Sequence, residues 1–258
     1  MNRSYKLLHI AIKAGEIILQ SGGEAYRVEE TMRRICYSFN MNQADCFVTP
    51  TGIMLSIIDK NGETYSVVKR ISTRTVNLEK ISMVNDLSRS ILPKKLTLDE
   101  VNDKLNQISN MKGFSSRVLV IAASFVAGFF TLLFGGNIKD FFVSLVIGLI
   151  IKITFTFLNK IQINEFFINS LCGAIASFIA ILSIKLNIGH DADKIIIGSI
   201  MILVPGLLIT NAIRDTISGD LVSGISRAVE AFFIAIAIAV GSGLVIKIWS
   251  LVSGGIII

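Results

Sequence analysis

The pattern of hydrophobic and polar positions divides the 258-residue chain into two halves of different character. Up to about residue 113, apolar residues recur at helical or alternating spacing, which is typical of elements with one buried face. Beyond that point, apolar runs of about 20 residues follow one another, and this is the length that a helix needs to cross a bilayer. The sequence therefore predicts an α+β domain over residues 1–113 and a membrane domain over residues 114–258.

The first half predicts four helices and three strands in the order ααβββαα. Asp-Lys-Asn-Gly at residues 59–62 is a strong hairpin signal between the second and third strands. This order favours a small α+β domain with a three-stranded sheet. The expected helices are 4–20, 24–39, 76–92 and 98–110, and the expected strands are 44–49, 52–58 and 63–71.

The second half predicts five transmembrane helices. At the amino terminus, Lys13 and Glu16 interrupt any apolar core, so residues 4–20 do not fit a signal peptide. The fold class that we expect is an α-helical integral membrane protein with five transmembrane helices preceded by a small α+β cytoplasmic domain. We place it in the cytoplasmic (inner) membrane. The expected spans are 118–136, 140–158, 166–186, 195–213 and 228–252.

The fourth expected span contains Pro205-Gly206 and then runs into a charged stretch. Proline removes a backbone donor and clashes with the preceding turn, so the helix should break here. In lipid such a break faces protein or a water-filled cavity, which is what a solute pathway needs. A Pro-kinked span followed by an ordinary charged loop is the alternative. The candidate transport-pathway residues are Pro205, Gly206, Asn211, Arg214, Asp215, Asp220, Arg227 and Glu230.

Two stretches of the first half concentrate polar side chains. Glu24, Arg27 and Glu29 lie at the expected start of a helix, where acids favour the positive end of the helix dipole. They are candidate site residues, but a helix cap and surface pairs three residues apart would explain them equally. Thr49 and Thr51 flank a proline and could form an active-site loop or a structural turn.

Composition excludes several classes of function. Of the 25 basic residues 17 lie in residues 1–117, as do 12 of the 19 acidic ones, so the first half is mildly basic. This suits a domain beside an anionic membrane, and no basic run interleaved with aromatics indicates nucleic-acid binding. Three scattered cysteines and two histidines predict neither a disulfide framework nor a metal site. The sequence predicts no cofactor, and no GxSxG, P-loop or HExxH motif supports an enzyme.

Three stretches resemble the threonine/serine exporter (ThrE-like) family. They are Ser-Gly-Gly-Glu-Ala-Tyr-Arg-Val-Glu at 21–29, Thr-Pro-Thr-Gly at 49–52, and Val-Pro-Gly with the following Asn-Ala-Ile-Arg-Asp and Gly-Asp at 204–220. Full-length members carry about twice as many spans as this chain, which therefore resembles the short split form, the YjjP-like half. The resemblance implies export of threonine and serine by the fused form, and of a dicarboxylate such as succinate by the split form.

We therefore expect a secondary-transporter subunit and not an enzyme. The resemblance implies a hetero-oligomer with a smaller, YjjB-type membrane subunit, with further copies of this chain as an added option. Arg214 or Arg227 would face a solute carboxylate, and Asp215, Asp220 or Glu230 is the candidate proton carrier. Two alternatives stay open. One is a membrane-tethered hydrolase using Glu24, Arg27 and the Thr49/Thr51 loop, and the other is a membrane assembly protein that transports nothing.

Overall fold

The computed structural model describes residues 3–41 and 43–253, which divide into two compact units. The first unit runs up to Gly113 and takes in Leu207–Val229 from later in the chain. The second unit runs from Phe114 to Gly206 and resumes at Glu230. The sequence assigned residues 207–229 to the membrane domain, whereas here they group with the amino-terminal elements because several of their polar side chains bond to them.

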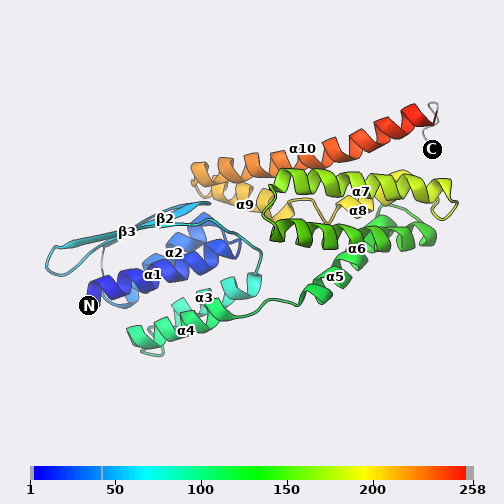
Figure 1. Ribbon diagram of the computed structural model, residues 1–258. Coiled ribbons are helices and arrows are strands. Elements are labelled where there is room, and N and C mark those ends of the chain that lie inside the picture. Colours follow the sequence, from blue (N-terminus) through cyan, green and yellow to red (C-terminus); the bar gives the residue numbers. More distant parts are fainter. Residues whose placement is uncertain (1–2, 42, 254–258) are drawn as a thin grey trace. The chain divides into compact units, whose positions relative to one another are not determined.

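Four helices of the first unit lie close to their predicted positions (Figure 1). The hydrophobic core of this unit gathers buried side chains from all four, including Leu7, Met32, Val84 and Leu105. Thr97 and Glu100 form a capping box that fixes the start of the fourth helix. The helices are α1 (Arg3–Gln20), α2 (Ala25–Ser38), α3 (Leu78–Ser90) and α4 (Leu98–Asn110).

The predicted three-stranded sheet is confirmed, with the antiparallel order β1-β2-β3. Its strands are β1 (Gln43–Thr49), β2 (Gly52–Ile58) and β3 (Thr64–Arg70). Alternate residues such as Ile53 and Leu55 are buried against the helices, whereas Met54 between them is exposed. This period of two is what a sheet with one covered face requires.

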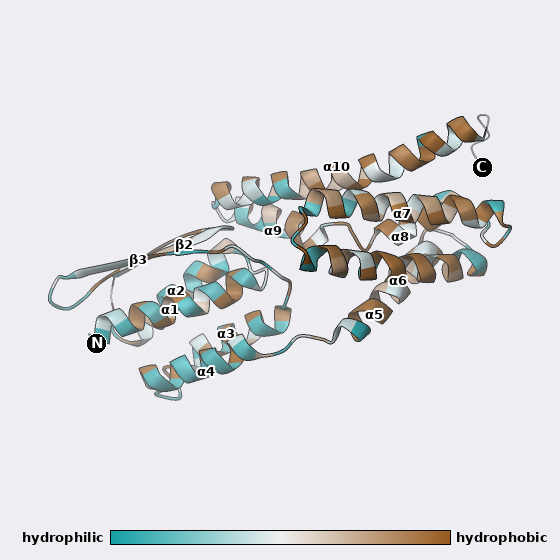
Figure 2. Cartoon of the chain, viewed as in Figure 1, coloured by the Kyte–Doolittle hydropathy of each residue, from teal (hydrophilic) through white to brown (hydrophobic). Residues whose placement is uncertain are grey.

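Within residues 3–41 and 43–253, four helices are long and apolar enough to cross a membrane. Figure 2 shows them as predominantly hydrophobic, whereas α1–α4 mix hydrophilic and hydrophobic positions. Capping side chains at Ser115, Asn137 and Asn164 start the first three. The four are α5 (Ser116–Leu133), α6 (Ile138–Lys160), α7 (Glu165–Lys185) and α10 (Leu221–Val252).

The fourth expected span, 195–213, is not one helix. It consists of α8 (Ala192–Ile200) and α9 (Gly206–Ile217), so the expectation of five continuous spans is not confirmed. Between them the Leu203 amide donates back to the Ile200 carbonyl at 2.8 Å, and Pro205 has no amide with which to continue the ladder. The predicted break therefore separates two helices and is not a kink within one helix.

Glycines allow close packing within the second unit. A Cβ at Gly198 of α8 would lie 2.1 Å from Thr131 Oγ1 of α5, and a Cβ at Gly241 of α10 would lie 1.8 Å from the Ser170 carbonyl oxygen of α7. Backbones approach this closely only where one residue has no side chain. The helix α8 is thereby held against α5.

Candidate functional site

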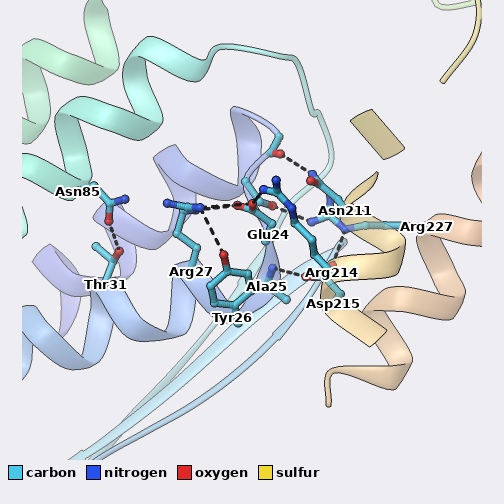
Figure 3. Close-up of polar contacts among 12 residues, drawn as sticks. Glu24, Ala25, Tyr26, Arg27, Thr31, Asn85, Asn211, Arg214, Asp215 and Arg227 are labelled. Atoms are coloured by element: carbon cyan, nitrogen blue, oxygen red, sulfur yellow. Dashed lines mark hydrogen bonds and ion pairs between the residues drawn. The ribbon is translucent and has the colours of Figure 1, made fainter. Parts of the chain in front are cut away.

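The start of α2 carries an ion-pair cluster built around Glu24 (Figure 3). Arg27 Nε donates to Glu24 Oε2 at 2.7 Å, and Arg214 Nη1 donates to Glu24 Oε1 at 2.6 Å. Glu24 is 5% exposed, whereas the side chains of Arg27 and Arg214 are 28% and 54% exposed. One buried carboxylate thus holds two arginines, one from α2 and one from α9, at the surface of the first unit.

The charge state of Glu24 follows from this pairing. Burial alone would raise the pKa of Glu24, but hydrogen bonds from Arg27 and Arg214 lower it to about 2. The carboxylate therefore stays ionised at any physiological pH. Glu24 occupies the N-cap position of α2, yet its side chain makes no capping bond, so helix capping does not explain it.

A second, fully buried ion pair caps α2 from a distant part of the chain. Asp215 of α9 accepts the Ala25 amide hydrogen at 3.0 Å through Oδ1, and its Oδ2 lies 3.0 Å from Arg227 Nε. Asp215 is 0% and Arg227 2% exposed. Burial raises the pKa of Asp215 despite the attraction of Arg227. A carboxylate at a helix amino terminus is favoured by the helix dipole, so this pair fastens α9 and α10 to α2.

Two further bonds hold the turn before α2. Asn211 Nδ2 donates to the Gly22 carbonyl at 2.8 Å, and Arg227 Nη2 donates to the Gly23 carbonyl at 2.7 Å. Gly22 adopts a left-handed φ of 88°, which glycine tolerates without strain. The tight turn therefore presents both carbonyls to α9 and α10.

A neighbouring group of contacts joins the start of α10 to the end of β1. Ser223 Oγ donates to the Val48 carbonyl at 3.0 Å, and the Val48 amide donates to Glu29 Oε1 at 3.2 Å. Burial raises the pKa of Glu29, and repulsion from Asp220 adds to this. Burial also raises the pKa of Asp220. Glu29 and Asp220 are thus two acids with raised pKa values near one another.

The remaining candidate residues lie apart from the ion-pair cluster. Pro205 and Gly206 form the break between α8 and α9, and Glu230 of α10 belongs to the second unit. Thr49 and Thr51 lie at the turn between β1 and β2, where Thr49 Oγ1 is 3.4 Å from the Gly52 carbonyl.

Chemically, the cluster offers two partly exposed guanidinium groups that share one carboxylate, and Arg27 also donates to the Tyr26 hydroxyl. Such a pair of guanidinium groups is suited to recognise a solute carboxylate. Within the described ranges, no group of three or more His, Cys, Asp or Glu side chains could hold a metal ion. Sequence reasoning missed the backbone groups of Gly22, Gly23 and Ala25, and also Ser223. No local signal marks them, because their partners lie between 175 and 204 residues away.

Comparisons with known proteins find similarity to proteins named as exporters or as a transporter subunit. The family model of the threonine/serine exporter (ThrE) matches residues 9–249. A Mycobacterium tuberculosis protein named "Probable threonine/serine exporter" is 22% identical over 92% of this chain, and the "Threonine/serine exporter" of Corynebacterium glutamicum is 25% identical over 94%. The chain spans about half of their lengths, 45% and 51%. The "Probable succinate transporter subunit YjjP" of Klebsiella aerogenes is 25% identical over 94% of this chain and 93% of its own length. No solved structure matches the chain.

Proposed function

The chain belongs to the threonine/serine exporter family, and on this premise we propose that it is one subunit of a secondary exporter for a small carboxylate-bearing metabolite. The solute is a dicarboxylate such as succinate, or threonine and serine. The second subunit is a smaller membrane protein of the YjjB type. We place the complex in the inner membrane with the amino-terminal domain in the cytoplasm.

Similarity to a protein named as a transporter subunit is the observation that carries this proposal. The chain is 25% identical to that protein over 94% of its own residues. A relative that bears the name of a subunit supports a proposal in which this chain works with a companion membrane protein. The four span-length helices and the interrupted α8–α9 segment support the transporter class, because broken helices mark solute sites in many secondary transporters.

We propose that Arg27 and Arg214 form the recognition site for a solute carboxylate on the first unit. Glu24 pairs with both arginines in the absence of solute and keeps them in place, and its single negative charge balances only one of their two positive charges. A carboxylate that reaches the exposed guanidinium of Arg214 can replace one of these bonds with a bidentate one. Asp215 and Arg227 have a different role in this proposal: both are buried, and they fix α9 and α10 on the first unit.

For proton coupling, Asp220 is the strongest of the three acids named from the sequence. It is half-buried, and burial raises its pKa; perturbed pKa values of this kind are common among residues that transfer protons. Asp215 is instead committed to Arg227 and to the Ala25 amide. The hydrolase alternative receives no support from the Thr49 hydroxyl, which bonds within its own turn.

Reconstitution with the companion subunit tests the proposal. Proteoliposomes loaded with labelled succinate, threonine or serine should lose one of these solutes faster than protein-free vesicles. Arg214→Gln should slow this efflux about tenfold or more, because one carboxylate bond to arginine is worth at least one decade. Arg34→Gln is the matched control, because Arg34 of α2 is also an arginine paired with a glutamate, Glu30, but lies outside the ion-pair cluster. Efflux by this variant should equal that of wild type.

The exporter function and the recognition site at Arg27 and Arg214 can be rejected separately. A wild-type complex that releases none of the three solutes above background would reject the exporter. Normal efflux in Arg214→Gln would leave the exporter standing and reject the recognition site.

A further inference from the structure

Buried hydroxyl groups form a layer inside the second unit. Four side chains form this layer, and each is 0% exposed. One comes from α8 and the other three come from α5, α6 and α7. The four are Thr131 of α5, Ser144 of α6, Ser177 of α7 and Ser199 of α8.

Helix contacts place these hydroxyls at one level. Thr131 Oγ1 lies 2.6 Å from Ser144 Oγ, and the same Thr131 side chain lies against Gly198, the neighbour of Ser199. The helices α6 and α7 run antiparallel because only residues 161–164 connect them, and Cys172 Sγ contacts the Ile151 carbonyl between them. Ser144 and Ser177 each lie about one and a half to two turns from that contact, in the same spatial direction. The four hydroxyls therefore gather around the carboxyl end of α8.

Two of the four hydroxyls are unusual in their bonding. Serine and threonine hydroxyls in membrane helices normally bond to a carbonyl of the preceding turn, as Thr131 does with Ala127 and Ser183 does with Ala180. Among the described residues, the hydroxyls of Ser177 and Ser199 have no hydrogen-bond partner. A buried polar group without a partner is costly, and it commonly marks the place of a ligand.

The backbone beside Ser199 adds acceptors. The last four carbonyls of a helix have no partner within it, and α8 ends at Ile200, one residue beyond Ser199. The carboxyl end of a helix also carries the negative end of its dipole. Hydroxyl oxygens next to such an end favour a positive charge, and broken transporter helices bind coupling ions in this way.

A small cavity lies beside the first turns of α8. It has a volume of about 40 Å³ and lies between α7, α8 and α10, where Ile181, Ile196 and Trp249 contribute to its walls and Asp193 supplies an acidic group. A space of this size holds more than one water-sized particle. Ile181 is one turn from Ser177 along α7, and Ile196 is one turn from Ser199 along α8, so the cavity is about one helical turn from the two unpartnered hydroxyls and is not lined by them.

From these observations we infer that Ser177 and Ser199, together with the carboxyl end of α8, form a binding site for a small cationic group held by oxygen atoms. The cation is either an alkali-metal ion such as Na⁺ or the ammonium group of an amino-acid solute. This inference rests on the proposed exporter function and gives it a site within the second unit.

The test measures ligand-dependent thermal stability of the purified full chain in detergent. In choline chloride, Ser177→Ala and Ser199→Ala should unfold at the same temperature as wild type or higher, because each removes an unpartnered hydroxyl. Replacing choline with Na⁺ should raise the melting temperature of wild type, with at least a tenfold loss of apparent Na⁺ affinity in both variants. Ser183→Ala, a control on the same helix whose hydroxyl already bonds to Ala180, should respond as wild type does.

A second arm separates the two sources of the cation. If Na⁺ has no effect but serine or threonine raises the melting temperature, and lactate does not, the site takes an ammonium group. The inference is overturned if none of these probes shifts the wild-type melting temperature, or if the shift persists in Ser177→Ala and Ser199→Ala.

Efflux by the reconstituted complex distinguishes failure of the cation site from failure of the exporter proposal. Normal efflux in both serine variants rejects the cation site and leaves the exporter intact. If Na⁺ or serine raises the melting temperature of a complex that shows no efflux, the cation site is supported and the exporter is rejected.

Discussion

The two units differ in how completely their buried polar groups are paired. In the first unit the buried charges of Glu24, Asp215 and Arg227 all meet opposite charges or backbone groups at 2.6–3.0 Å. In the second unit Ser177 and Ser199 are equally buried but bond to nothing in the described chain. An unpaired buried charge would be far more costly than an unpaired hydroxyl. The paired charges of the first unit therefore hold its helices in one arrangement, whereas the two unpaired hydroxyls of the second unit can bind a ligand.

Removing Arg227 should have the largest effect on stability. Arg227→Met leaves Asp215 buried without its counter-charge and also frees the Gly23 carbonyl, which should cost about 3–5 kcal/mol of the free energy of unfolding. Labelling of the Cys36 thiol during denaturant titration measures this, because Cys36 is fully buried in the same unit.

The double variant Arg227→Met/Asp215→Asn is the control. It removes the stranded charge while retaining an acceptor for the Ala25 amide, so it should be more stable than Arg227→Met alone. Equal stability of the two variants would show that the ion pair does not fasten α9 and α10 to α2.

Acid should weaken the first unit through Glu24. Its pKa is about 2 in the fold against 4.5 when unperturbed. Because the folded pKa is the lower one, this stabilisation is complete above pH 4.5 and is lost as the pH falls from 4.5 toward 2. The shift corresponds to about 3 kcal/mol at most. Denaturant titrations of wild type and Glu24→Gln across this range measure it.

The difference in unfolding free energy between wild type and Glu24→Gln should shrink as the pH falls. A constant difference from pH 6 to pH 3 would mean that Glu24 does not titrate with a lowered pKa.

Packing in the second unit should depend on which glycine of α10 is changed. Gly241→Ala forces a Cβ onto the Ser170 carbonyl of α7 and should destabilise by about 1–3 kcal/mol. Gly243→Ala meets no atom within 4 Å and should be neutral or slightly stabilising through helix propensity. The fluorescence of Trp249, the single tryptophan, reports unfolding of this helix. Similar losses in both variants would contradict the α7–α10 contact.

Much of the fold was predictable because its signals are local. The β-like run at 52–58 indicated a strand, the Asp59–Gly62 turn indicated the hairpin, and Pro205 indicated the break between α8 and α9. Helix α4 begins and ends where predicted, at Leu98 and Asn110. In each case the periodicity or the backbone chemistry of a few neighbouring residues decides the outcome.

The grouping of the site residues could not be predicted, because it depends on contacts across the chain. The sequence marked Glu24 and Arg27 as one stretch, and Arg214, Asp215 and Arg227 as another, without joining them. The bonds between the two stretches link residues about 190 to 204 apart. The hydroxyls of Ser177 and Ser199 carry no signal either, since single serines are common in membrane helices.

Arg214 should have the smallest effect on stability, and this sharpens the contrast with Arg227. Both are arginines of the same stretch that pair with an acid, but the Arg214 side chain is 54% exposed and that of Arg227 only 2%. Arg214→Gln should cost about 0.2–1 kcal/mol, because an exposed pair is screened and Glu24 keeps its two bonds to Arg27. Denaturant titration in low and high salt measures this, and high salt should reduce the difference further. A cost comparable to that of Arg227→Met would assign Arg214 to the fastening of α9, whereas a stable variant that has lost efflux would assign it to solute recognition.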